Sequence, residues 1–356
     1  MFTTLNLLRD LYNAALQESR DFYSRFDKSI SAYEQMKELK ELRLVRPEFS
    51  LIHTHLLQDV ITRRDRAMQA FFRRKKLGQK PGFPRFKGRW RYRTFTFKDA
   101  GKNNGIALIT AGKRVRIHGV GNVKVRLHRP MEGKVKQASV THGGDGHWYV
   151  AFVCEVEQPA PLAKTGKEVG IDVGVRNIIA PSDGPPLVNP KFLAAAEEQL
   201  KTAQRCVSRR KRGSRRRRKA VVLLAKAHDR VRRRRLDFHH KLAFNLVKIY
   251  DVIAVEDLNI KGLAAGMLAK QVHDAAWGQF FLILGHKAES AGRSKIKVNP
   301  RGTSQECNVC GATVTKSLSV RVHRCPSCGD VEDRDTNSGK VILKRAGLAL
   351  RRGRSS

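Results

Sequence analysis

Apolar residues recur every three or four positions at the start of the chain, which is the spacing of one face of an α-helix. Two such series are present, made of Leu7, Leu8, Leu11, Tyr12 and Ala15, then Leu56, Val60, Ile61, Met68, Phe71 and Phe72. Pro81-Gly82-Phe83-Pro84 follows, and its prolines and glycine break a helix. The pattern therefore predicts an all-helical region over residues 1–80.

Short runs of strand-forming residues replace the helical pattern from residue 81 onwards. They cover residues 92–97, 105–109, 115–117, 123–127 and 148–153, and glycines lie between most of them. Short strands with regular glycine turns predict a small β-barrel or curled sheet over residues 81–165. Arginine and aromatic residues alternate between Phe83 and Phe97, which suits base stacking, although half-buried strands have the same composition.

Two apolar, strand-like runs in the next region carry acidic residues. The first follows the linker Gln158-Pro159-Ala160-Pro161 and contains Asp172, and the second ends in Glu256 and Asp257. An unpaired carboxylate in an apolar strand is costly unless a cation meets it, so each acid has a structural and a functional interpretation. With the helical sequence between them, these runs predict an α/β region over residues 166–302.

The charge of the chain is strongly unbalanced. It has 71 Lys and Arg residues against 32 Asp and Glu residues, which gives a formal net charge of +39. Such a chain repels itself unless a polyanion neutralises it, so nucleic acid is the expected partner.

The basic residues are densest between positions 205 and 235, where apolar residues still recur at helical spacing. We therefore expect two helices that dock by one face and project arginines outward to hold a nucleic-acid backbone. The alternatives are a solvated charge run or a nuclear-localisation-like patch. The predicted nucleic-acid contacts are Arg209, Arg210, Arg212, Arg215, Arg216, Arg217, Arg218, Arg232, Arg233 and Arg234.

No run of eighteen apolar residues is present, and the first residues lack the pattern of a secretory signal. We expect a chain without a membrane partner that stays in the cytoplasm, where its thiols remain reduced.

Four cysteines lie near the end of the chain as two Cys-x-x-Cys pairs, Cys307 with Cys310 and Cys325 with Cys328. A glycine follows each pair and lets the turn close. Two such turns fourteen residues apart predict a four-cysteine zinc ribbon over residues 303–332. A single pair would also suit a redox disulfide. The alternative to a functional role for the ribbon is a purely structural one, in which the zinc only holds a small fold together.

Acidic residues follow the last cysteine, in the sequence Asp333-Arg334-Asp335-Thr336-Asn337 before an apolar run. Acids at a helix N-terminus are commonly caps. Three acidic positions, at two strands and one helix start, also fit a two-metal phosphodiester nuclease.

These motifs together resemble the TnpB family of transposon-encoded proteins. The resemblance rests on Gly170-Ile171-Asp172-Val173-Gly174, Val255-Glu256-Asp257-Leu258-Asn259, Thr303-Ser304-Gln305-x-Cys307-x-x-Cys310-Gly311, Cys325-Pro326-x-Cys328-Gly329, and Asp333-Arg334-Asp335-x-Asn337. TnpB proteins are RNA-guided DNA endonucleases related to the type V CRISPR effectors. The resemblance runs from about Leu5 to Leu343.

The resemblance implies an α/β multidomain architecture. A RuvC nuclease domain of RNase H-like fold would cover residues 166–302 and 333–356, with the zinc ribbon inserted between them. A β-barrel wedge domain over 81–165 and a helical recognition lobe over 1–80 would precede it.

The resemblance also implies Mg2+-dependent cleavage of DNA. Asp172, Glu256 and Asp335 would be the catalytic acids and would hold two Mg2+ ions, while the four cysteines bind structural zinc. Guide RNA and target double-stranded DNA would be the partners of a monomeric ribonucleoprotein near the nucleoid of a prokaryote. Cleavage would leave 5′-phosphates.

Two other functions fit parts of the pattern. A nuclease-silent protein, such as an RNA-guided repressor or a transposition accessory factor, would bind DNA without cutting it, and loss of a catalytic acid would signal it. A strand-transferring transposase also uses an acidic triad, but the zinc ribbon before the last acid argues against it.

Two features depart from the family pattern. Helix-like sequence begins close to Met1, where the family opens with a strand, so we expect part of the wedge barrel to be missing. After the last acid, Asn337-Ser338-Gly339 stands where the family has Asn-Ala-Ala, and a glycine inside a helix costs about 1 kcal/mol relative to alanine.

Overall fold

The computed structural model describes residues 1–100, 104–109, 113–317 and 320–347. The chain divides into two compact units, Met1–Glu157 and Gln158–Ser356, which are described in turn. No helix in the described ranges is long and apolar enough to cross a membrane.

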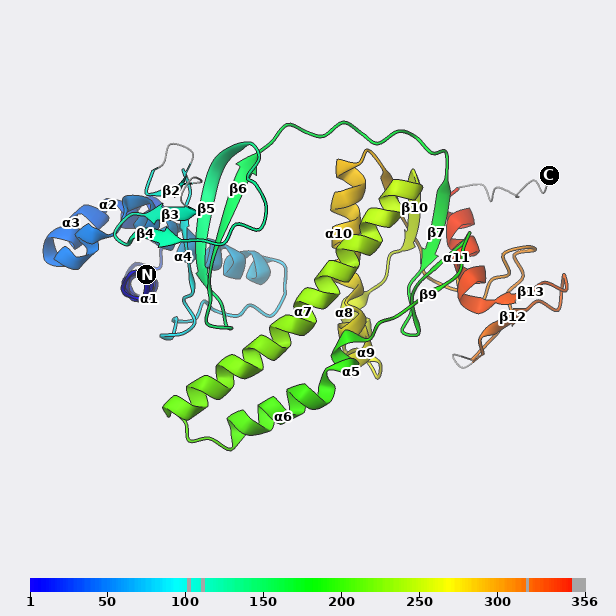
Figure 1. Ribbon diagram of the computed structural model, residues 1–356. Helices are drawn as coiled ribbons and strands as arrows, with labels where there is room; N and C mark the ends of the chain where they lie inside the picture. Colours follow the sequence, from blue (N-terminus) through cyan, green and yellow to red (C-terminus); the bar gives the residue numbers. More distant parts are fainter. Residues whose placement is uncertain (101–103, 110–112, 318–319, 348–356) are drawn as a thin grey trace. The chain divides into compact units, whose positions relative to one another are not determined.

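The first unit begins with helices and continues with two small sheets (Figure 1). Its helical elements are α1 (Phe2–Phe26), α2 (Ala32–Lys37), α3 (Leu39–Val45), the 3-10 helix η1 (Pro47–Leu51) and α4 (Thr54–Lys76). The two predicted apolar series lie on α1 and α4, which pack against each other. Strand β1 contacts both helices, and Phe95 and Phe97 join its side of the core.

The strands of the first unit form two separate three-stranded antiparallel sheets. One has the order β1-β5-β6 and the other the order β2-β3-β4. Their bounds are β1 (Thr94–Phe97), β2 (Ile106–Ile109), β3 (Arg114–Ile117), β4 (Gly121–Lys124), β5 (Lys134–His142) and β6 (Trp148–Glu155).

The predicted β-barrel is not confirmed, since the described strands form no closed barrel. A barrel must pair every edge strand, but β1 pairs with β5 alone. A helix side chain contacts this edge strand, because Arg63 Nη1 on α4 donates to the Thr94 carbonyl oxygen at 2.7 Å. The strands β2, β3 and β4 have only four residues each and join a sheet of their own.

A five-stranded mixed sheet organises the second unit, with the order β11-β10-β7-β8-β9. Strands β7, β10 and β11 are parallel, and β8 and β9 continue the sheet antiparallel. The bounds are β7 (Glu168–Asp172), β8 (Asn177–Pro181), β9 (Leu187–Val188), β10 (Val252–Glu256) and β11 (Ser294–Val298).

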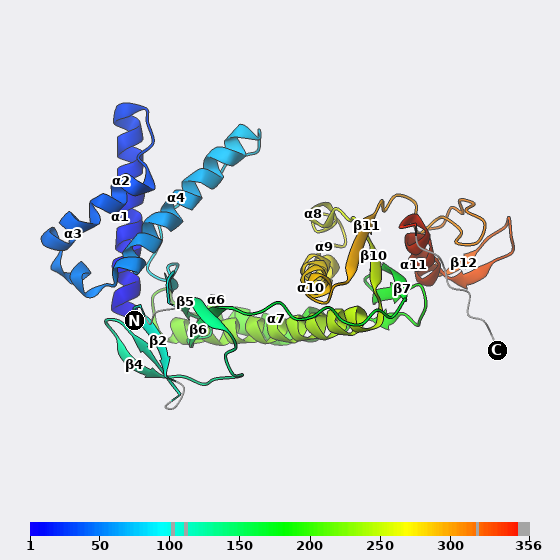
Figure 2. The same ribbon diagram turned by 90° about the horizontal axis from the view of Figure 1, so that it is seen from above.

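Helices cover both faces of this sheet (Figure 2). The helices of this unit are α5 (Phe192–Ala195), α6 (Glu197–Ser208), α7 (Arg215–Ile249), α8 (Ile260–Leu263), α9 (Ala269–Ala275), α10 (Trp277–Ser290) and α11 (Arg334–Arg345), of which α7, α10 and α11 cover the sheet. On one face, α7 and α10 pack on the apolar side chains of β7 and β10, such as Ile171 and Val255. On the other, α11 packs directly on β7, β8 and β10.

Side chains alternate along a strand, so the residues beneath α11 can be read from the register. Gly170 and Ala254 are paired in register, and both lie against α11: a Cβ on Gly170 would meet the α11 backbone, and Ala254 packs with Ile342. Two positions further along each strand are Asp172 and Glu256. These two acids therefore share the α11 face at the carboxyl ends of neighbouring parallel strands.

Candidate acidic site and metal centre

The third acid reaches this sheet edge from the start of α11. Asp333 is the N-cap of the helix and accepts from the backbone N–H groups of Asp335 and Thr336 at 2.9 and 3.1 Å. Asp335 follows in the first turn and is 8% exposed. Asn177 at the start of β8 donates its Nδ2 to Asp335 Oδ2 at 3.3 Å, which places this carboxylate beside the sheet. Capping and the candidate chemistry thus belong to different acids of the motif.

The three carboxylates influence one another electrostatically. Burial raises the pKa of Asp172 well above its usual range, and the neighbouring Glu256 and Asp335 raise it further. Burial also raises the pKa of Glu256, although the hydroxyl of Thr303 donates to its Oε1 and opposes this shift. Three acids in this arrangement are costly unless a cation joins them.

A protein cation already lies beside this group. Arg334 donates from Nη2 to Asp335 Oδ1 at 3.1 Å, and its charge lowers the pKa of Asp172. Arg321 lies 3.9 Å from the same oxygen. The motif Asp333-Arg334-Asp335 thus supplies one cap, one cation and one candidate metal ligand in three successive residues.

The three carboxylates fit divalent metal binding. Carboxylate oxygens are the donors that Mg2+ prefers, and the raised pKa values of Asp172 and Glu256 mean that a cation bound nearby would stabilise their ionised forms. Among the described residues, these acids do not form a group whose ligand oxygens all lie within 4.8 Å of one another.

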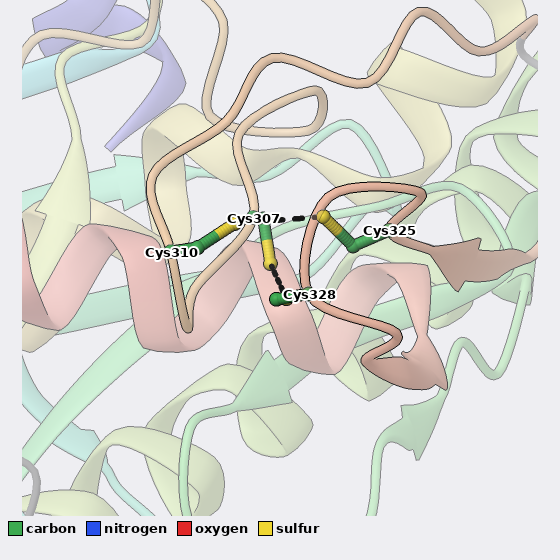
Figure 3. A group of neighbouring side chains, drawn as sticks. All are labelled: Cys307, Cys310, Cys325 and Cys328. Atoms are coloured by element: carbon green, nitrogen blue, oxygen red, sulfur yellow. Dashed lines mark hydrogen bonds between the residues drawn. The ribbon is translucent and has the colours of Figure 1, made fainter.

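The four predicted cysteines converge in a second site (Figure 3). Their sulfur atoms all lie within 4.8 Å of one another, with 3.6 Å between Cys307 and Cys328 and 3.5 Å between Cys310 and Cys325. A disulfide would need about 2 Å. Four thiolates at about 2.3 Å from a tetrahedral zinc ion are about 3.8 Å apart, so the arrangement fits zinc.

The backbone explains why the cysteines converge. Each pair lies on a turn in which the glycine N–H donates to the first cysteine carbonyl, Gly311 to Cys307 at 3.0 Å and Gly329 to Cys325 at 2.9 Å. Both glycines have φ of 77°, a left-handed conformation that favours glycine. The strands β12 (Val322–Arg324) and β13 (Val331–Asp333) form the hairpin that carries the second pair.

A buried histidine lies against the cysteine site. His323 has a ligand nitrogen within 4.8 Å of the Cys307 sulfur and of an Asp330 oxygen. The Lys316 ammonium can only donate, so its bond to Nδ1 leaves the proton of a neutral imidazole on Nε2. Among the residues that the structure describes, none forms a hydrogen bond with Nε2.

The predicted arginine-rich helices are present as α6 and α7, which pack on each other. Nine of the ten predicted contacts are exposed, namely Arg209, Arg210, Arg212, Arg215, Arg216, Arg218, Arg232, Arg233 and Arg234. Arg217 differs, because it is half-buried and donates its Nη1 to the Val207 carbonyl oxygen at 2.9 Å. Its guanidinium braces the turn between the two helices. Arg232 and Arg233 both pair with Asp229.

Sequence reasoning did not identify the residues that surround the acids. Arg334 could have been found, since it stands between two acids of the same motif. Thr303 belongs to the motif that precedes the first cysteine pair, but that motif did not indicate its contact with Glu256. Asn177 comes from a distant segment and carries no local signal.

Comparison with known sequence families gives two matches along the second half of the chain. Residues 151–266 match OrfB_IS605, described as "Probable transposase", and residues 277–342 match the "Cas12f1-like, TNB domain". The first match contains Asp172 and Glu256, and the second contains the cysteines and Asp335.

Individual relatives agree with these families. A protein of Streptomyces pristinaespiralis named "Putative RNA-guided DNA endonuclease" is 31% identical over 97% of this chain and 85% of its own length. InsQ of Escherichia coli K12, with the same description, is 26% identical over 81% of this chain and 73% of its own. A Cas12m of Allomeiothermus silvanus, named a "CRISPR-associated DNA-binding protein", is 26% identical over 34% of this chain and 25% of its own.

A solved structure has a similar fold. The Cas12f1 chain in a cryo-EM complex with single guide RNA and target DNA matches 96% of this chain and 81% of its own, with a TM-score of 0.62. The sequence identity is 13%, so this likeness describes the fold.

Proposed function

This chain belongs to the TnpB-like family of RNA-guided DNA endonucleases, and on this premise we propose that Asp172, Glu256 and Asp335 form its DNA-cleaving site. The supporting observation is the convergence of these acids, from two parallel strands and one helix start, at one edge of the sheet. The substrate is double-stranded DNA, and a bound guide RNA selects the sequence by base pairing.

Asp172, Glu256 and Asp335 would hold two Mg2+ ions. When bound, these ions supply an activated water and stabilisation of the departing 3′-oxygen, so the products carry 5′-phosphates. The chain's own residues set up the site: Thr303 orients the Glu256 carboxylate, and Asn177 orients that of Asp335. Arg334 offsets the negative charge until metal and DNA arrive.

The remaining parts support this reaction. Cys307, Cys310, Cys325 and Cys328 hold structural zinc, and the exposed arginines of α6, α7 and their turn contact phosphates of the guide RNA or the heteroduplex. The protein would act as a monomeric ribonucleoprotein in the cytoplasm, near the nucleoid of a prokaryotic cell.

The test uses isosteric variants. Asp172→Asn, Glu256→Gln and Asp335→Asn keep the shape of each side chain and should each lower the cleavage rate of a guide-matched DNA by at least about 100-fold. Binding should remain, because backbone contacts lie elsewhere. The matched control is Asp257→Asn, since Asp257 follows Glu256 but is exposed and pairs with Lys297.

Cleavage by all three amide variants at the rate of the unmodified protein would exclude this site. A second candidate function is guided DNA binding without cleavage, which the similarity to a Cas12m DNA-binding protein favours. It predicts tight binding of matched DNA by the unmodified protein with no metal-dependent products.

A further inference from the structure

Asn337 is buried in the second turn of α11, although asparagine is a poor residue for a helix interior. Its amide bonds to a different segment. Nδ2 donates to the Glu306 carbonyl oxygen at 2.8 Å, and Oδ1 accepts from the Asn308 backbone N–H at 2.9 Å. Oδ1 also accepts from Asn308 Nδ2 at 3.1 Å. One side chain therefore holds the backbone on both sides of the zinc ligand Cys307.

We propose that Asn337 is a positioning residue that couples the zinc centre to the catalytic acid Asp335. This proposal rests on the proposed function. Asn337 and Asp335 are two residues apart, which is about 3 Å along a helix and about 200° around it. The helix can therefore present Asn337 to the first cysteine turn and Asp335 to the sheet edge at the same level.

The contacts of α11 with this turn are divided between its two ends. Asn337 forms the contact near Asp335. At the other end, Lys344 donates its Nζ to the Asn308 carbonyl oxygen, and Arg345 Nη2 lies 2.6 Å from Glu306 Oε2. Seven residues separate Asn337 from Lys344, which is about 10 Å along the axis.

This division makes the role of Asn337 separable from simple attachment of the ribbon. Without the Asn337 amide, Lys344 and Arg345 still hold the turn, and the four thiols still converge. What is lost is the contact that fixes the turn beside Asp335. The start of α11 then gains freedom, and the Asp335 carboxylate loses its fixed place opposite Asp172 and Glu256.

The size of the effect follows from the geometry that metal catalysis requires. Outer-shell partners of metal ligands typically change affinity or activity by 10- to 100-fold, and a 1 Å displacement of a reacting group can cost about 100-fold. Asn337→Ala should therefore lower the single-turnover cleavage rate by about 10- to 100-fold. It should also raise the Mg2+ concentration that gives half-maximal cleavage.

The experiment compares Asn337→Ala with Lys344→Ala in the full chain purified with its RNA. Both substitutions remove hydrogen bonds between α11 and Asn308, two for Asn337 and one for Lys344, but only Asn337 lies near Asp335. Zinc per chain is measured by elemental analysis, and cleavage is followed across a Mg2+ titration. We expect both variants to keep zinc and only Asn337→Ala to shift the Mg2+ midpoint.

A readout without cleavage accompanies these measurements. Binding of Mn2+, followed by its EPR signal, should weaken in Asn337→Ala and remain unchanged in Lys344→Ala. Hydrogen exchange of the α11 amides from Thr336 to Gly339 should rise in Asn337→Ala. In the unmodified protein the same amides should exchange faster once a chelator removes zinc.

Unchanged Mn2+ binding and exchange in an Asn337→Ala protein that retains zinc would overturn the coupling. So would a loss of cleavage that only parallels zinc loss. If Asn337→Ala does not fold, Asn337→Asp tests the same contact, because it keeps the acceptor for Asn308 and replaces the donor to the Glu306 carbonyl by a carboxylate oxygen that repels it. It should also weaken Mn2+ binding, and no shift would reject the proposal. Failure of the proposed function gives a different result, because the unmodified protein itself then does not cleave DNA. The Mn2+ binding and hydrogen-exchange measurements still show whether Asn337 couples the zinc centre to Asp335.

Discussion

Replacing Gly170 by alanine should separate helix α11 from the sheet. Gly170 lies on β7 directly beneath α11, and an added Cβ would be 2.0 Å from the Gly339 carbonyl oxygen and 2.6 Å from the Leu343 backbone nitrogen. Ordinary contact begins near 3.4 Å, and backbone atoms of a helix cannot rotate aside. The helix must therefore shift by more than 1 Å, and Asp335 shifts with it.

Overpacking of a well-packed interior costs typically about 1–3 kcal/mol, and a rigid backbone contact places Gly170→Ala at the upper end, near 3 kcal/mol. Trp277 is buried in the second unit, whereas Trp90 and Trp148 lie in the first. With Trp90 and Trp148 replaced by phenylalanine, urea unfolding followed by fluorescence reports on the second unit alone. Gly170→Ala should lower the midpoint by about 1 M for an unfolding slope near 3 kcal/mol per M.

The matched control for this prediction is Gly184→Ala in the same unit. A Cβ there would lie 3.6 Å from Pro181 Cγ, which is ordinary contact, and Gly184 does not have a left-handed φ. The control should unfold within a few tenths of 1 M of the parent. An unchanged midpoint in Gly170→Ala would refute the close packing of α11 on β7.

Three further predictions concern the zinc site, the arginines and pH. Purified protein should carry about one zinc per chain, and Cys325→Ser should lower both zinc content and cleavage, because β13 leads directly into α11. Replacing Arg215, Arg216 and Arg218 by alanine should reduce the slope of log binding constant against log salt concentration for duplex binding by about 0.9 per lost phosphate contact. Arg217→Ala should leave this slope unchanged and destabilise the turn that Arg217 braces. Burial and two neighbouring acids raise the pKa of Asp172 above its usual 3.8, so without Mg2+ the folded chain holds a proton that the unfolded chain releases. The stability that the Asp172 carboxyl contributes is present below about pH 3.8 and is lost as the pH rises through the pKa of this group in the folded chain. The urea midpoint of unfolding should therefore vary less across pH 4 to 8 in Asp172→Asn than in the unmodified protein.

Local patterns predicted the second unit well because its chemistry lies at element ends. The Cys-x-x-Cys-Gly turns close by bonds within five residues, so spacing was enough to predict that the four sulfurs converge. The acids come from distant segments, but the period of a strand and the start of a helix determine where each side chain lies. The resemblance to TnpB is confirmed by the relative that covers 97% of this chain.

The predicted barrel is not confirmed, because strand pattern alone does not determine which strands pair. The predicted runs overlap five of the six strands, but they missed β5, which pairs with both β1 and β6. The described strands form two small sheets, and Arg63 on α4 bonds to the edge strand β1. Strand pairing depends on contacts between segments far apart in the sequence, and a local pattern of residues does not predict these contacts.

The sequence also did not show which role each residue within a motif has. The sequence indicated that acids at this helix start are commonly caps but not which acid is the cap: Asp333 caps α11, and its loss should cost about 1 kcal/mol. Gly339 was treated as a tolerable helix defect. In the structure a Cβ there would lie 2.9 Å from the Ala180 carbonyl oxygen, so the close approach of α11 to the sheet explains the glycine.

RNA-guided cleavage is tested most directly with the ribonucleoprotein itself. The RNA that co-purifies with the chain is sequenced, and plasmids carrying the matching sequence beside randomised flanks are incubated with the protein and Mg2+. We predict that matched plasmids with a permitted flank are cut to ends with 5′-phosphates, that scrambled plasmids stay intact, and that Asp335→Asn cuts neither. Absence of a discrete RNA, equal cleavage of scrambled plasmids, or full cleavage by Asp335→Asn would contradict it.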